Sequence, residues 1–114
     1  MTITAKKVLI NVRTLLSDER RWIRGLFAKD AAHHPVIADD ESAVCWCLEG
    51  ALYKACPYGV QDSPLYDTWQ KAHSVLQRVI GVVGLVAFND SPKTTHAMVL
   101  EALDKAIESV DSLQ

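Results

Sequence analysis

Apolar positions recur at helical spacing in four stretches, which together cover most of the chain. In residues 4–17 they fall three and four residues apart, which predicts an amphipathic helix. Residues 63–83 repeat this pattern and open on a Ser-Pro pair, which is typical of a helix start. In the last stretch Thr94 or Thr95 supplies the cap of a C-terminal helix. The apolar face of that helix comprises Val99, Leu100, Leu103, Ala106, Ile107 and Val110.

The remaining apolar stretch predicts a central helix that begins at Asp39, Asp40 and Glu41 and runs to about Ala55. It has two nearly opposite apolar faces, so we expect it to pack on both sides. Gly50 lies on one of them and would allow another backbone to approach closely. The two faces are Ala43, Val44, Cys47, Leu48, Ala51, Leu52 and Ala55, and Trp46, Gly50 and Tyr53.

Two connections complete the expected fold. The first lacks a helical period and allows a short β-hairpin around residues 23–37. Within the second, residues 85–88 allow either a helical turn or a short extended piece, and turn-forming residues follow. We therefore predict a mostly α protein, with residues 1–114 forming one domain built as a bundle of about four helices.

Composition narrows the class of protein. A chain of 114 residues with 49% hydrophobic residues can bury one core. The N-terminus lacks the features of a secretory signal, and the longest apolar run, residues 79–88, is shorter than the roughly 18 residues of a membrane span. We expect a cytoplasmic protein without a membrane partner.

The charge is unevenly distributed. Residues 1–30 hold seven basic and three acidic side chains, a balance of +4, whereas the rest holds five basic and eleven acidic ones, a balance of −6. A basic N-terminal region can bind nucleic acid, although such a run more often forms a solvated face. Trp22 lies among three arginines and could stack a base, anchor a partner or fill the core.

Three cysteines lie within residues 43–56. On a helix, Cys45 and Cys47 would point roughly 200° apart and could not share a metal ion, so we predict no metal site and no cofactor. Cys47 is read as a core residue. Cys45, about one turn into the predicted helix, is a weak candidate for an activated thiol.

Asp90 and His96 are the weak candidates for catalysis. His96 opens the last helix, where the helix dipole disfavours its protonation, and a neutral imidazole beside Asp90 could transfer protons while Asn89 orients a ligand. The alternative is that His96 is a hydrogen-bonded residue at the edge of the core and that Asn89 and Asp90 shape a turn.

Three segments resemble a family of small bacterial and phage proteins that is classed as a domain of unknown function. They are WIRGLFAKD (22–30), WCLEGAL (46–52) and FNDSPKTTHAMVLEALDKAI (88–107). The matching positions are Trp22, Gly25, Ala28, Asp30, Cys47, Gly50, Ala51, Asn89, Asp90, Thr95 and His96. The resemblance implies no activity, but it implies that Trp22, Asp30, Asn89, Asp90 and His96 gather in space.

These observations favour a non-enzymatic interaction or regulatory protein with a protein partner or a second copy of itself, because no catalytic motif is present and three tryptophans suit an interface. The first alternative is a small enzyme or ligand-binding protein with a site near Asp90 and His96, where Trp22, Asp30 and Asn89 are weak binding candidates. The second is nucleic-acid binding through the basic N-terminal region.

Overall fold

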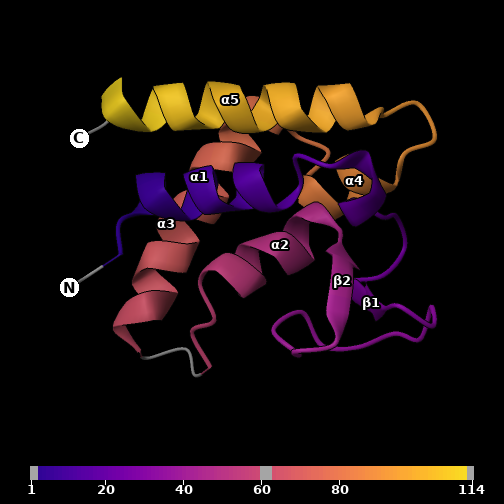
Figure 1. Ribbon diagram of the computed structural model, residues 1–114. Coiled ribbons are helices and arrows are strands. Elements are labelled where there is room, and N and C mark those ends of the chain that lie inside the picture. Colours follow the sequence, from indigo (N-terminus) through magenta and orange to yellow (C-terminus); the bar gives the residue numbers. More distant parts are fainter. Residues whose placement is uncertain (1–2, 60–62, 113–114) are drawn as a thin grey trace.

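The computed structural model describes residues 3–59 and 63–112. Five α-helices and a small antiparallel sheet form most of this part of the chain, which confirms the expected mostly α fold (Figure 1). In chain order the elements are α1 (Ala5–Leu15), the 3-10 helix η1 (Glu19–Arg21), β1 (Ala28–Asp30), β2 (Ala43–Trp46), α2 (Leu48–Ala55), α3 (Pro64–Ile80), α4 (Leu85–Asp90) and α5 (His96–Ser112).

Helices α1 and α5 lie side by side in opposite directions, and α3 crosses behind them (Figure 1). Helix α2 packs beneath α1 and separates α3 from the two strands. The buried side chains of all these helices form one core, because each helix turns its apolar stripe toward the others. No helix in residues 3–59 or 63–112 is long and apolar enough to cross a membrane.

Local capping explains where three predicted helices begin. The hydroxyl of Thr4 accepts from Lys7 N at 3.1 Å, that of Ser63 from Tyr66 N at 3.3 Å, and that of Thr95 from Met98 N at 3.2 Å. Helix α3 ends at Ile80 and is followed by its cap residue Gly81, whose φ of 97° is a conformation that other residues rarely adopt. Residues 85–88 belong to α4, so the helical alternative holds there.

The prediction of one helix from Asp39 to Ala55 was wrong. Residues 43–46 form β2, which pairs with β1, and α2 begins only at Leu48 after the cap residue Cys47. Asp40 accepts from the backbone N and the hydroxyl of Ser42 and shapes a turn instead of capping a helix. The short apolar run before Cys47 fits a helix or a strand, and pairing with a distant strand decides between them.

The expected hairpin region holds β1, but the main partner of β1 comes from beyond this region. Ala28 pairs with Trp46, while an isolated bridge joins Lys29 to Pro35 and closes a tight turn. The strand also brings the preceding backbone onto α2. A Cβ atom at Gly50 would lie 2.0 Å from the carbonyl oxygen of Phe27, which confirms that this glycine permits a close backbone approach.

Candidate functional site

Asn89 is the centre of a buried hydrogen-bond network. Its side chain is fully buried, and its Oδ1 accepts from Trp22 Nε1 at 2.6 Å and from Leu48 N at 3.1 Å. Its Nδ2 donates to the carbonyl of Ile23 at 2.9 Å and to Asp90 Oδ1 at 3.0 Å. These bonds use both lone pairs and both amide hydrogens. The amide therefore joins the segment after η1 to the start of α2 and to α4.

Asp90 and Arg24 extend this network. Asp90 Oδ1 also accepts from Gly25 N at 2.9 Å. The guanidinium of Arg24 lies 4.6 Å from the centre of the Trp22 ring and donates to the carbonyls of Ser91 and Thr94. Residues that the sequence suggested as a ligand site thus form hydrogen bonds that hold the connection after η1 against the loop before α5.

His96 forms a structural bond at the end of α1. Its Nε2 lies 2.6 Å from the carbonyl oxygen of Leu16, and since a carbonyl only accepts, Nε2 carries the hydrogen. Its ring centre is 6.0 Å from that of Trp22. Asp90 instead lines a hollow of about 270 Å³ together with Cys47. His96 is not among the residues that line this hollow. The two acid-base candidates face different environments.

Four of the five residues that the resemblance implied would gather do so: Trp22, Asn89, Asp90 and His96. Asp30 serves a separate turn, where its Oδ1 accepts from His34 N at 2.8 Å and Ala32 N at 2.9 Å. The hydrogen bond from the His34 backbone is the main cause that lowers the pKa of this carboxyl.

The three cysteines are buried free thiols. The helical argument about Cys45 and Cys47 was wrong in its premise, because Cys45 lies in β2 and Cys47 precedes α2. Cys47 Sγ accepts from Gly50 N at 3.3 Å, and burial raises the pKa of this thiol and of Cys56. Among the described residues no group of three or more His, Cys, Asp or Glu could hold a metal ion.

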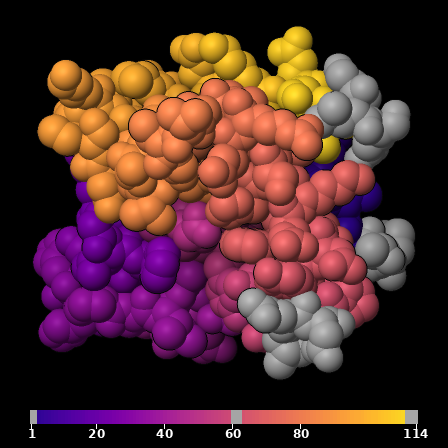
Figure 2. Space-filling view, turned by 180° about the vertical axis from the view of Figure 1, so that it is seen from behind, coloured from indigo at the N-terminus to yellow at the C-terminus, as the bar shows by residue number. Residues whose placement is uncertain are grey.

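A different site lies between α2, the start of α3 and the connection before β2. We call this hollow of about 370 Å³ the aromatic–acidic pocket. In Figure 2 the purple connection and the salmon helix α3 face the viewer with the magenta of α2 between them. The pocket is lined by Phe27, Ile37, Ala38, Asp39, Glu49, Gly50, Tyr53, Tyr58 and Trp69.

Packed rings form the wall of the aromatic–acidic pocket. The ring of Tyr58 lies 5.1 Å from that of Tyr53 and 5.1 Å from that of Trp69, in edge-on and tilted arrangements. Tyr66 stacks on Trp69 with the ring centres 5.8 Å apart, but it does not line the pocket. The indole N–H of Trp69 is buried without a hydrogen-bond partner. Burial is the main cause that raises the pKa of Tyr58.

Two carboxylates also line the pocket. Asp39 is exposed, whereas the side chain of Glu49 is only 21% exposed and its Oε1 lies 3.2 Å from Nε2 of His73. The His73 ring in turn lies 4.8 Å from that of Trp69, so the contact between Glu49 and His73 lies beside the aromatic wall. One side chain of α2 thereby combines a negative charge with a fixed position beside the rings.

Sequence reasoning missed the aromatic–acidic pocket because it assigned Tyr53 and Trp69 to core stripes. The available signal was the density of rings, with Tyr53, Tyr58, Tyr66 and Trp69 within 17 residues, and with Glu49 one helical turn before Tyr53. The pattern could not show the contribution of Phe27, which precedes β1, or of Asp39, which lies between β1 and β2, because tertiary contacts set the paths of both segments.

Comparison with known protein families identifies the family of this chain. The model of a family of unknown function, DUF6197, matches residues 1–109, which is nearly its whole length. The chain belongs to DUF6197. This confirms the resemblance to a domain of unknown function, and membership assigns no activity. Neither the curated proteins nor the solved structures include a match to the chain.

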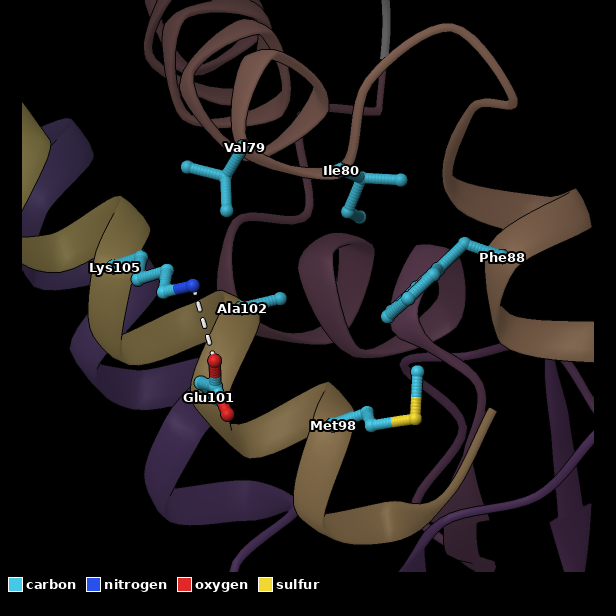
Figure 3. Close-up of a pocket in the computed structure, with 7 residues that line it drawn as sticks. All are labelled: Val79, Ile80, Phe88, Met98, Glu101, Ala102 and Lys105. Carbon is cyan, nitrogen blue, oxygen red and sulfur yellow. Dashed lines mark ion pairs between the residues drawn. The ribbon is translucent and has the colours of Figure 1, made fainter. Parts of the chain in front are cut away.

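A third hollow in this DUF6197 protein lies where the end of α3 meets α4 and α5. Its volume is about 180 Å³, and Figure 3 shows Phe88 and Met98 facing each other across it beneath Ile80. Its charged groups, Lys105 and Glu101, are bound to each other at 3.0 Å. This groove is smaller and lacks the ring wall, so the aromatic–acidic pocket is the stronger candidate for a ligand site.

Proposed function

We propose that this protein is a non-enzymatic binding module that holds a small organic ligand in the aromatic–acidic pocket. The observation that supports this most directly is the ring wall of Tyr53, Tyr58 and Trp69 around a hollow of about 370 Å³. Ligand sites typically enclose about 300–1,000 Å³ and combine aromatic walls with a few polar groups. Glu49 and Asp39 supply those polar groups.

The assignment to binding rests on the nature of the lining. Among the described residues of the pocket there is no serine, cysteine, lysine or histidine, and thus no nucleophile beside a base of the usual kind. The side chains that the sequence offered for acid-base chemistry are engaged elsewhere, with His96 bonded to Leu16 and Asp90 to Gly25 and Asn89. Both observations favour a binding role over the enzyme alternative.

The test is a nuclear magnetic resonance titration of the isotope-labelled protein with a mixed library of neutral and charged fragments. We expect the fragments that bind to shift the Trp69 indole and Gly50 amide signals. The variant Tyr53→Leu should lose these shifts because it removes part of the wall.

The matched control is Tyr66→Leu, which removes a ring from the same cluster but not from the lining. If fragments bind elsewhere and leave the Trp69 and Gly50 signals in place, the pocket is not the ligand site. If both variants lose binding equally, general loosening of the ring cluster explains the result and the assignment to the pocket falls.

A further inference from the structure

We infer that the ligand of the aromatic–acidic pocket carries an organic ammonium group, which the rings and the two carboxylates bind together. This inference rests on the proposed function and adds the chemical class of the ligand. It predicts that the pocket binds a cationic ligand more tightly than an uncharged ligand of the same shape, a difference that a purely apolar pocket would not show.

The rings provide the first part of the argument. The faces of Trp and Tyr carry partial negative charge and attract a cation that lies within about 6 Å of the ring centre. Trp69, Tyr58 and Tyr53 all border the same hollow, so one ammonium group can contact more than one of them. Trp22 does not compete, since the guanidinium of Arg24 already lies against its ring.

The charges provide the second part. Glu49 and Asp39 line the hollow, and among the described lining residues there is no lysine, arginine or histidine. The carboxylate of Glu49 is largely buried and held in place by His73, so it needs no reordering to meet a cation. An anionic ligand would be repelled by both carboxylates, whereas a neutral ligand would gain no charge attraction from them.

Shape supports a compact, weakly hydrated head group. A quaternary ammonium group presents methyl groups that pack against rings, and its diffuse charge loses less hydration than a primary ammonium does. The exposed side chains of Phe27 and Ile37 also line the hollow and can contact the chain that bears the head group. The head group can belong to a free small molecule or to a methylated lysine side chain of a protein.

Calorimetric titrations with matched probes test the inference. Choline and its uncharged isostere 3,3-dimethyl-1-butanol have the same shape and differ in charge. We expect the wild-type protein to bind choline about tenfold or more tightly than the isostere, a ratio that corresponds to about 1.4 kcal/mol. A third probe, acetylated trimethyllysine amide, represents a methylated lysine of a protein. Tighter binding of this probe than of choline would identify a peptide ligand.

Two carboxamide variants separate charge from shape. Glu49→Gln should lower the affinity for choline toward that of the isostere and leave the affinity for the isostere unchanged. Asp67→Asn changes an exposed carboxylate on α3 outside the lining and should change neither.

The possible failures are distinguishable. Equal affinities for choline and the isostere, with both probes shifting the Trp69 indole signal, would overturn the ammonium inference and leave the binding function standing. No binding of choline or trimethyllysine amide at the pocket would also overturn the ammonium inference, and the fragment titration would then decide the binding function separately.

Discussion

Asn89 offers the sharpest test of how the fold is held together, through the substitution Asn89→Asp. The two side chains have the same shape, and the introduced carboxyl keeps both acceptor bonds, from Trp22 Nε1 and Leu48 N. It loses both donor bonds, so a carboxylate oxygen would face the Ile23 carbonyl at about 2.9 Å and Asp90 Oδ1 at about 3.0 Å.

The cost follows from these contacts. Two lost hydrogen bonds contribute about 1 kcal/mol each. Two like charges about 4 Å apart repel by about 4 kcal/mol at an effective dielectric constant near 20, and partial exposure of Asp90 reduces this. We expect Asn89→Asp to lower the free energy of unfolding by about 3–5 kcal/mol at pH 7, a large part of the roughly 5–15 kcal/mol typical of a domain.

The loss should depend on pH in a definite direction. Burial and the charge of Asp90 both raise the pKa of the introduced carboxyl in the folded state above its unfolded value of about 3.9. The folded state therefore holds the proton more tightly. The penalty should be smallest below about pH 4, where the protonated group can donate to Asp90 or Ile23, and should grow as pH rises through the raised pKa.

Urea unfolding of wild type and variant from pH 4 to pH 7, followed by circular dichroism and tryptophan fluorescence, measures this. The matched control is Asn11→Asp at a partly exposed position of α1, where we expect a change within about 0.5 kcal/mol. A loss below about 1 kcal/mol at pH 7, or a loss that does not change with pH, would refute the role of Asn89 Nδ2 as a buried donor.

Three further predictions concern packing, capping and thiol reactivity. Gly50→Ala places a methyl group against the Phe27 carbonyl and should lower the free energy of unfolding by about 1–3 kcal/mol in urea; an unchanged midpoint would show that the two backbones separate easily. Ser63→Ala removes the cap of α3 and should cost about 1 kcal/mol in the same assay, whereas Ser63→Asp should recover most of it. Burial raises the pKa of Cys47 and Cys56, so little thiolate is present at neutral pH and we expect both thiols to react with iodoacetamide only after unfolding. Rapid labelling of these cysteines in the folded protein, measured by mass spectrometry, would contradict this.

The helices that the sequence predicted well are those with local signals. Helices α1, α3 and α5 each combine an uninterrupted apolar stripe with a hydroxyl cap, and both features can be read within a few residues. The prediction of a helix over residues 39–55 was wrong for the first half of that segment. There the apolar run is short enough for either element, and the strand forms because β1 is available as a partner.

For the site residues too, the sequence indicated what depends on neighbouring positions but not what depends on contacts between distant segments. The motif suggested that Trp22 and Asn89 are neighbours, and a bond across 67 positions confirms it, but the motif could not show that the contact serves the fold. Asp30 recurs in the same motif yet shapes its own turn. The aromatic–acidic pocket joins three segments that no periodicity connects, so only the tertiary arrangement identifies it.

The most direct test of the central proposal is an intermolecular nuclear Overhauser measurement on the protein in the presence of choline. If the aromatic–acidic pocket binds an ammonium group, the N-methyl protons of choline should show contacts with ring protons of Tyr53, Tyr58 and Trp69, and Glu49→Gln should weaken them. Contacts confined to other surfaces, such as Phe88 and Met98 of the hollow between α3, α4 and α5, would contradict the proposal.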